Sequence, residues 1–168
     1  MYAYCLFCET QRCKAIAYQL MHCGITDQAF SPQIIKRQRT KGRNIDVLTD
    51  MLPGYVFLFS EKPLPSYAPF YGITGIIRRV GERDNGWALT DGDAEFALNL
   101  LRKDGIVGQV AVFKVGDEVC LDDPLFNGCA GRITQIDYRK QRARVEYHFA
   151  RMDCFTWIAI EVIDRPEK

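Results

Sequence analysis

The stretch that decides the fold is YVFLF at residues 55–59, an apolar run rich in aromatic and β-branched side chains that follows a Pro-Gly pair. An uninterrupted apolar run of this length, bounded by a turn signal, is typical of a strand buried inside a sheet. Side chains alternate along a strand, so Tyr55, Phe57 and Phe59 share one face. We expect 55–59 to be a central strand with one of its two faces on the core.

The residues before this strand predict a strand, a helix and a long hairpin. Residues 2–8 are mostly apolar and predict the first strand. Apolar side chains at helical spacing predict a helix from about 12 to 23, which ends at Gly24. Residues 30–50 predict a β-hairpin, because two extended segments flank the polar turn KRQRTKGRN at 36–44. That turn carries five positive charges.

The region after the central strand predicts two helices, a strand and a linker. A short helix is expected between 65 and 71, followed by a strand around 73–77. Thr90 and the acidic Asp93 match a capping box, which predicts the start of a second helix with an apolar face. Residues 104–113, DGIVGQVAVF, contain two glycines and no helical period, and we expect a linker there.

The last third of the sequence predicts short strands separated by glycine turns. Strands are expected at 115–119, 133–136, 144–149 and 156–163. The segment 144–149, RVEYHF, alternates strictly between apolar and polar side chains. Several short strands within about 50 residues favour a small β-barrel.

Composition and charge exclude several classes of protein. The chain has 168 residues with 22 basic and 21 acidic side chains, a net charge of +1 that argues against a protein coating DNA broadly but permits a local basic patch. No stretch approaches the ~18 apolar residues of a membrane span. The N-terminus has no basic residue before its apolar run, so no signal peptide is expected. Seven cysteines, an odd number, then indicate reduced thiols in a cytoplasm.

The cysteines near the N-terminus raise the question of a zinc site or a catalytic thiol. Cys5 and Cys8 are joined by Cys13 and by the pair His22-Cys23. Residues three apart on a strand point to opposite faces, whereas zinc needs four converging ligands. Buried thiols are the better interpretation, and we expect no metal and no cofactor. A cysteine nucleophile paired with a histidine is a further possibility, but no catalytic signature surrounds either histidine, and we expect no enzyme activity.

Several motifs together resemble a known family. VGDEVCLDDPLFNGCAGRITQID at 115–137 resembles the KOW motif, and YCLFCET at 4–10, LPGYVFLF at 52–59 and YGITGIIRRVG at 71–81 resemble the NGN domain of NusG-family transcription factors. The resemblance implies an α+β protein. An NGN α/β sandwich at 1–103, with an antiparallel sheet flanked by helices, would be followed by a linker at 104–113. A five-stranded SH3-like KOW barrel would occupy 114–168.

Within the family, LTDGDAEFALNLL at 89–101 and IDYRKQRARVEYHF at 136–149 look most like specialised LoaP-type paralogues, with the RfaH type as the neighbouring possibility. The resemblance implies a non-catalytic, monomeric cytoplasmic protein that grips the clamp helices of bacterial RNA polymerase. It would promote antitermination of particular operons after recruitment by a leader RNA hairpin or an exposed DNA strand. The alternatives are a general NusG-type elongation or termination factor, and a free KOW protein that binds RNA or the ribosome.

The resemblance also assigns candidate contacts with the polymerase. Matched motif by motif, Phe7, Tyr55 and Phe57 fall on the apolar polymerase-binding patch of such proteins, and Tyr4 is a weaker candidate. Aromatic side chains dominate binding hot spots, but these residues would equally suit a core. A second contact in RfaH-type proteins uses a histidine and threonine run, for which Ser66 and Tyr67 are the nearest substitutes here.

Clustered positive charges suggest contacts with nucleic acid. The candidates in the predicted hairpin tip are Lys36, Arg37, Arg39, Lys41 and Arg43, and Lys14, Arg78 and Arg79 could extend the patch. A protruding basic arm suits phosphate contacts and shape-led recognition of an RNA hairpin. The alternative is a solvated charged face.

In the predicted barrel, the family uses apolar loop residues to recruit partners such as ribosomal protein S10 or the Rho factor, for which Phe126 and Ile136 are the candidates. The barrel arginines could contact RNA, but ten acidic residues balance nine basic ones after residue 113, which favours simple solvation.

Overall fold

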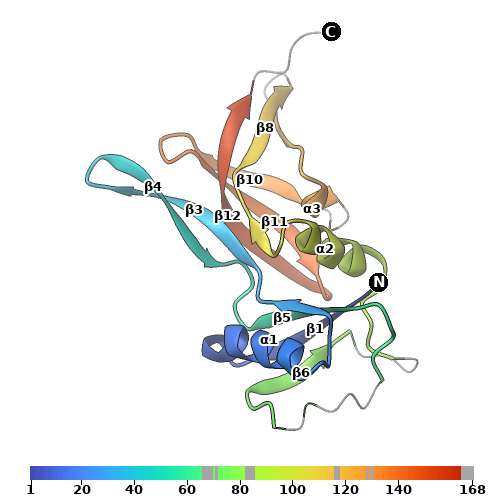
Figure 1. Cartoon of the computed structure of the whole chain (residues 1–168). Helices are drawn as coiled ribbons and strands as arrows, with labels where there is room; N and C mark the ends of the chain where they lie inside the picture. Colours follow the sequence, from blue (N-terminus) through green and yellow to red (C-terminus); the bar gives the residue numbers. More distant parts are fainter. Residues whose placement is uncertain are drawn as a thin grey trace. The chain divides into compact units, whose positions relative to one another are not determined.

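The computed structural model describes residues 1–65, 70, 72–81, 86–115, 118–127, 129 and 131–163 (Figure 1). The chain divides into two compact units. The first unit contains Met1–Pro32 and Leu52–Gly105, and the second contains Gln33–Met51 and Ile106–Lys168. A hairpin from the first third of the sequence therefore clusters with the C-terminal part of the chain.

The first unit is built on a four-stranded antiparallel sheet. Its strands are β1 (Tyr2–Cys8), β2 (Gln28–Phe30), β5 (Tyr55–Ser60) and β6 (Ile76–Val80), in the order β2-β5-β1-β6. β1 and β5 are the central strands, which confirms the central position that the apolar run at 55–59 predicted for β5. β6 begins three residues later than expected, because Gly75 adopts a φ of 97° that interrupts the strand before Ile76.

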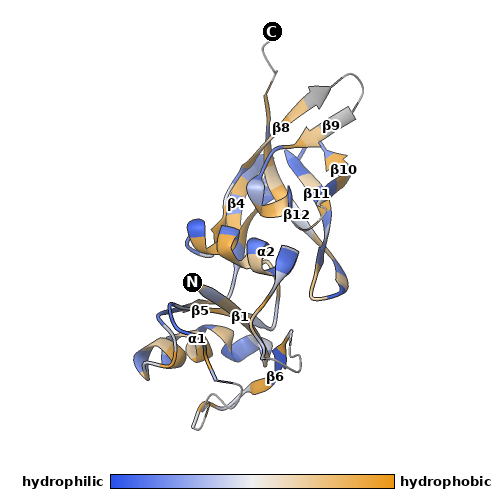
Figure 2. Ribbon diagram, turned by 90° about the vertical axis from the view of Figure 1, so that its right-hand side faces the viewer, coloured by the Kyte–Doolittle hydropathy of each residue, from blue (hydrophilic) through white to orange (hydrophobic). Residues whose placement is uncertain are grey.

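Helices cover both faces of this sheet (Figures 1 and 2). α1 (Cys13–His22), which follows a short 3-10 turn η1 (Thr10–Arg12), packs its apolar side against Leu6, Val56 and Leu58. α2 (Asp91–Arg102) covers the other face, where Phe96 lies 6.3 Å from Phe57 between ring centroids. All six residues of β5 are buried in consequence. The expectation that only one face of β5 would lie on the core was therefore wrong.

The helix termini follow the predicted signals in part. Gly24 has a φ of 67°, and the N–H of Ile25 donates to the carbonyl of Leu20 at 3.0 Å, which ends α1 as the sequence predicted. Thr90 is the N-cap of α2, but its side chain makes no capping hydrogen bond. Its backbone carbonyl instead accepts from the N–H of Ala94 at 3.2 Å. The short helix expected at 65–71 lies largely outside the described residues.

The second unit begins with the long hairpin, formed by β3 (Gln33–Thr40) and β4 (Arg43–Asp50). Lys41 and Gly42 make its two-residue turn, and their φ angles of 49° and 79° are those of a type I′ turn. We call this hairpin the basic arm. β7 (Ile106–Val107) pairs with β3 in parallel and completes a three-stranded sheet in the order β4-β3-β7.

The C-terminal strands form a five-stranded sheet in the order β10-β11-β12-β8-β9. They are β8 (Val110–Val115), β9 (Glu118–Leu121), β10 (Arg132–Asp137), β11 (Arg142–Phe149) and β12 (Met152–Ile163), with the short α3 (Pro124–Asn127) between β9 and β10. The outer strands β9 and β10 contact each other, so the sheet curls like a half-barrel. Val145, Tyr147 and Phe149 of β11 are buried and the side chains between them are not, which confirms the predicted alternation.

Residues 104–113, expected to be a linker, are instead structured. They contain β7 and the first part of β8. Val107, Val110 and Val112 are all buried, so these residues contribute to packing rather than merely connecting. The alternation within β8 was hidden in the sequence because Ala111 and Phe113, which lie between and after the buried valines, are themselves apolar. The overall expectation of a mixed α+β protein is confirmed.

Candidate partner and nucleic-acid surfaces

An aromatic pair lies at the end of the two central strands of the first unit. Phe7 and Tyr55 are direct neighbours in the register of β1 and β5, and their ring centroids are 5.2 Å apart. Phe7 is half-buried, and the guanidinium of Arg78 on β6 lies 5.5 Å from the centroid of its ring. Aromatic rings flanked by an arginine are typical of protein-binding hot spots. We call these three residues the aromatic patch.

Because Gly54 has no side chain, the ring of Phe7 can pack against the backbone at this position. The φ of Gly54 is 89°, and a Cβ at this position would lie 2.9 Å from Cε2 of Phe7. Its carbonyl also accepts a hydrogen bond of 2.7 Å from the N–H of Cys8. The Pro-Gly pair that marks the start of β5 in the sequence therefore also shapes the aromatic patch.

Three of the predicted polymerase contacts are buried: Tyr55, which is 9% exposed at the start of β5, and the two core residues Phe57 and Tyr4. Phe57 is fully buried beneath α2, and its ring packs against those of Phe30 and Phe96. Tyr4 is also buried, 4.5 Å from Trp87 between ring centroids, and its hydroxyl accepts from the N–H of Leu64 at 2.8 Å. Because helices cover both faces of the sheet, neither ring is available at the surface. The other candidates, Ser66 and Tyr67, lie outside the described residues.

The basic arm presents its positive charge at the turn. Arg39, Lys41 and Arg43 are exposed there, and Lys36 lies half-buried nearer the base. Residues 33–50 contain five basic and two acidic side chains, so the arm carries a net charge of +3. All five basic candidates therefore lie on one hairpin, but one of them does not reach into solvent.

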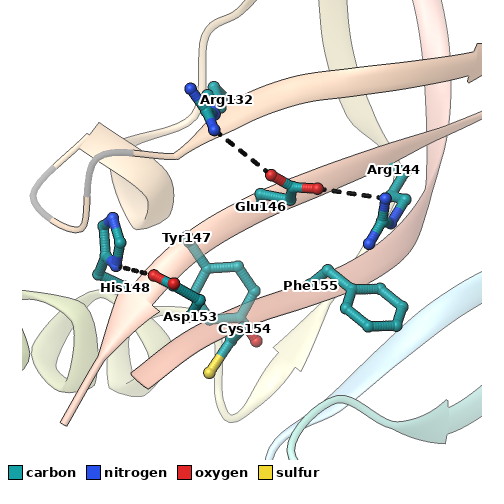
Figure 3. A pocket seen from close by; sticks show the side chains of 8 residues that line it. All are labelled: Arg132, Arg144, Glu146, Tyr147, His148, Asp153, Cys154 and Phe155. Carbon is teal, nitrogen blue, oxygen red and sulfur yellow. Dashed lines mark ion pairs between the residues drawn. The ribbon is translucent and has the colours of Figure 1, made fainter. Parts of the chain in front are cut away.

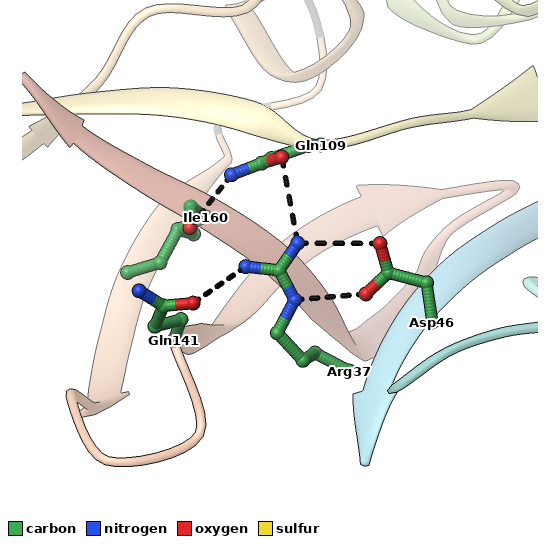
Figure 4. Close-up of polar contacts among 5 residues, drawn as sticks. All are labelled: Arg37, Asp46, Gln109, Gln141 and Ile160. Carbon is green, nitrogen blue, oxygen red and sulfur yellow. Dashed lines mark hydrogen bonds and ion pairs between the residues drawn. The ribbon is translucent and has the colours of Figure 1, made fainter. Parts of the chain in front are cut away.

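That residue is Arg37, which the structure ties to its surroundings (Figure 4). Its Nε and Nη2 donate to the two carboxylate oxygens of Asp46 at 2.8 and 3.2 Å. Nη1 donates to Oε1 of Gln141 at 2.8 Å, and Nη2 also reaches Oε1 of Gln109 at 3.5 Å. The Arg37 side chain is only 12% exposed, so it anchors the arm within the second unit rather than reaching into solvent.

Mutual interaction shifts the pKa of both partners in this pair. The hydrogen bond from Arg37 lowers the pKa of Asp46, and the same bond raises the pKa of Arg37. Both pKa shifts favour the ionised forms of the two side chains. Gln109 is held in turn, because its Nε2 donates to the carbonyl of Ile160 on β12 at 3.2 Å.

The remaining basic candidates belong to the first unit. Lys14 is exposed on α1, and Arg78 is part of the aromatic patch. Arg79 is half-buried, with its guanidinium 5.5 Å from the ring of Phe70 and 5.3 Å from the ring of Trp87. Arg79 therefore packs against aromatic rings, whereas Lys14 remains a surface cation.

The apolar partner site expected in the barrel is not formed by Phe126. This side chain is fully buried, and its ring packs edge-on against Tyr147 at 5.6 Å. A Cβ on Gly131 would lie 2.4 Å from Cβ of Phe126, so the missing side chain at 131 allows the Phe126 backbone to approach. Ile136, the other candidate, is half-buried on β10.

The cysteines of β1 and the first residue of α1 are core residues. Cys8 and Cys13 lie in the core between β1 and α1, while Cys5 is buried on the opposite face of β1. Burial raises the pKa of Cys5, and it raises the pKa of Cys8 to about 12. Among the described residues, no three histidine, cysteine, aspartate or glutamate side chains converge as a metal site would need. No helix in the described part of the chain could cross a membrane.

A hollow on the outside of the five-stranded sheet was not anticipated from the sequence. It has a volume of about 300 Å³ (Figure 3). Arg132, Arg144, Glu146 and Phe155 contribute to its lining. No signal in the sequence places Phe155 on the outside, because apolar side chains occupy both faces of β12; only the burial pattern of the structure does so.

Comparison with known proteins finds similarity to the NusG proteins of two bacteria. No family model matches the sequence. Over 106 residues, the chain is 24% identical to the transcription termination/antitermination protein NusG of Rickettsia conorii, a match covering 62% of this chain and 55% of that protein. The matched part thus spans about half the length of that relative.

The second match is structural. The fold matches NusG of Thermotoga maritima, from a study of domain interaction in that protein, with a TM-score of 0.52 and 19% identity. The match covers 94% of this chain and 93% of the Thermotoga chain. The chain is similar to NusG in sequence and in fold. The resemblance to NusG seen in the sequence motifs is therefore supported, and the mixed α+β fold agrees with it.

Proposed function

We propose that this chain is a NusG-family transcription factor of the bacterial cytoplasm that binds RNA polymerase and promotes processive antitermination of specific operons. The observation that carries the proposal is the combined similarity to NusG, in sequence and across nearly the whole fold. An NGN domain would correspond to the first 103 residues and a KOW barrel to 114–168. The action is stoichiometric binding rather than catalysis.

The aromatic patch is the proposed contact with the polymerase clamp helices. Phe7 and Tyr55 offer adjacent rings, and Arg78 adds a cation beside them. Such anchors contribute most of the binding energy in a protein interface. Tyr4, Tyr55 and Phe57 are buried, whereas Phe7 is half-buried and Arg78 is exposed. The accessible part of the proposed contact is therefore Phe7 with Arg78, and the Tyr55 ring packs beside Phe7. Ser66 and Tyr67 stay candidates for a second contact.

Binding to purified bacterial core RNA polymerase tests this contact. We expect the double variant Phe7→Ala/Tyr55→Ala to bind at least about tenfold more weakly, because a hot-spot aromatic contributes about 2 kcal/mol. Arg78→Gln, which removes no core atom, should weaken binding in the same direction. The matched control is Tyr18→Ala, since Tyr18 is a 64% exposed aromatic residue on α1. Equal binding by all four proteins would overturn the proposed contact.

The basic arm is the proposed reader of the recruiting nucleic acid. Arg39, Lys41 and Arg43 project at the turn of a regular hairpin, a geometry that suits phosphate contacts along a structured RNA. A leader RNA hairpin is the proposed ligand, with an exposed DNA strand as the alternative.

Specific recruitment separates this proposal from a general NusG-type factor. The triple variant Arg39→Gln/Lys41→Gln/Arg43→Gln should lose affinity for the leader RNA and show a weaker salt dependence, because fewer counterions are released. It should still bind core polymerase. Equal affinity of the wild type for leader RNA and for a scrambled RNA would favour a general factor instead. RNA binding without any polymerase binding would favour a free KOW-type protein.

A further inference from the structure

The outward side of β10, β11 and β12 carries a ladder of arginines and aromatic rings. The Arg144 guanidinium lies 4.3 Å from the ring centroid of Phe155, and that of Arg142 lies 4.4 Å from the ring centroid of Trp157. In the register of β11 and β12, Arg144 is opposite Trp157 and Arg142 is opposite Ala159. Both arginines therefore reach diagonally across the strand pair by the same offset. We call this surface the outer face.

The aromatic rings of the outer face are accessible. Phe155 is 58% exposed and Trp157 is half-buried. In Figure 3 the Phe155 ring projects from β12 beside Arg144. A guanidinium covers one side of a ring only, so a second planar group can stack on the other side. An exposed phenylalanine backed by arginine is therefore a platform for a nucleobase rather than a core residue.

Charge is unevenly distributed around the five-stranded sheet. After residue 113 the chain has nine basic and ten acidic side chains, but residues 131–157 contain six basic and only three acidic ones. The positive charges are therefore gathered on the part of the sheet that includes the outer face. From the sequence alone, the near-neutral total charge after residue 113 favoured simple solvation. That total conceals the excess of positive charge in residues 131–157.

Local ion pairs do not neutralise the excess. Glu146 faces two cations, Arg132 at 3.6 Å and Arg144 at 3.2 Å. Asp137 likewise faces Lys140 at 3.9 Å and Arg142 at 3.4 Å. Each of these two carboxylates is thus shared by two positive side chains. Asp153, which pairs with His148 at 2.6 Å, adds a third carboxylate, so these side chains leave one net positive charge with His148 counted as neutral. That charge is complementary to a polyanion.

We propose that the outer face binds single-stranded RNA, with bases stacked on Phe155 and Trp157 and phosphates held by Arg132, Arg142 and Arg144. The choice of RNA over DNA rests on the proposed function, because a transcribing polymerase releases a single RNA strand. This site differs from the basic arm, which is proposed to read a folded hairpin. The two lie in one unit, since β3 of the arm contacts β12 and Arg37 bonds to Gln141 next to Arg142.

Fluorescence anisotropy with a labelled 12-nucleotide oligouridylate tests this inference on the full-length protein. The probe has no hairpin, so it isolates single-strand binding. We expect Phe155→Ala to weaken binding by on the order of tenfold, and Phe155→Trp to restore it, because stacking needs a ring and not a particular one. Arg144→Gln should weaken binding and lower the salt dependence by about 0.7 in log–log slope. The controls are Tyr18→Ala and Lys62→Gln, which alter an exposed ring and an exposed cation in the first unit.

The outcomes separate this inference from the proposed function. Unchanged oligouridylate binding by Phe155→Ala, with an unchanged melting temperature, would overturn it, as would the absence of binding by the wild type. Tighter binding of the matching oligodeoxythymidylate would contradict the choice of RNA. The arm triple variant should keep its affinity for oligouridylate, and an equal loss in that variant would also contradict a separate site. The proposed polymerase contact does not include the outer face. Phe155→Ala should therefore bind core polymerase like the wild type.

Discussion

Arg37 and Asp46 stand directly opposite each other in the register of β3 and β4, and the guanidinium binds both carboxylate oxygens at 2.8 and 3.2 Å. The same guanidinium donates to Gln141, between β10 and β11. One arginine in the predicted nucleic-acid surface is therefore a structural anchor. It fixes the arm to the five-stranded sheet, whereas the cations at the turn are exposed.

Removing this anchor should loosen the arm without unfolding the chain. Arg37→Gln loses the ion pair and the bond to Gln141, and we expect a loss of about 1 kcal/mol, typical of a partly exposed pair. Hydrogen exchange of the backbone amides in 33–50 should accelerate, while that of β11 stays unchanged. Lys36→Gln is the control, because it removes a neighbouring cation. Unchanged exchange in the Arg37→Gln arm would contradict the anchoring role.

The ion pair also predicts a dependence on pH. Because the folded structure lowers the pKa of Asp46, the pair stabilises the arm at pH values above the ordinary aspartate pKa of about 3.9. That contribution is lost as the pH falls through the lower folded-state value. The NMR shift of Arg37 Nε should therefore be constant from pH 5 to 8 and change below about pH 4. Asp46→Asn should abolish the change, and its persistence in that variant would refute the assignment.

Gly54 should be intolerant of a side chain. Gly54→Ala introduces a Cβ 2.9 Å from the Phe7 ring at a φ of 89°. We expect a loss of about 2 kcal/mol or more in the free energy of unfolding, together with weaker polymerase binding, because the ring must move. Gly24→Ala is the matched control, since Gly24 has a φ of 67° but no atom within 4 Å of its Cβ position. Urea unfolding measures the free energy of unfolding of both variants. If Gly54→Ala and Gly24→Ala lose the same amount, the contact with Phe7 causes no destabilisation beyond the backbone strain.

The cysteines should differ in reactivity according to burial. Cys23 is exposed, whereas Cys5, Cys8 and Cys13 are buried, and burial raises the pKa of Cys8 to about 12. Iodoacetamide reacts with the thiolate, so at pH 8 Cys23 should be alkylated first and the three buried thiols only on unfolding. Mass spectrometry of partially labelled protein checks this order. Rapid labelling of Cys8 in folded protein would contradict the packing beneath α1.

The sequence predicted those elements whose periodicity is uninterrupted. β1, α1, β5 and β11 each carry a clear apolar period of two or 3.6 residues or a continuous apolar run, and their positions are confirmed. The sequence did not predict β7, which has only two residues between Gly105 and Gly108, or the start of β8, in which apolar residues stand on both faces. A short strand that pairs with a distant partner leaves no local signal of that pairing.

The candidate sites were predicted less well, because exposure depends on what packs against a strand. Alternation places Phe57 on a face but does not reveal that α2 covers it. Phe126 is buried because Gly131, five residues later, lets the chain close over it. Arg37 lies in a run of cations, and only the fold reveals its partners at 109 and 141. The turn of the arm was predictable because its residues are local and polar.

Terminator read-through tests the central claim most directly. Single-round transcription by purified bacterial RNA polymerase should use a template with the leader of the operon beside the gene, followed by a terminator. Added wild-type protein should increase read-through, and Phe7→Ala/Tyr55→Ala should not, while Tyr18→Ala should behave as the wild type. Read-through that is unchanged by the wild-type protein, under conditions in which it binds the polymerase, would contradict antitermination as the function of this chain.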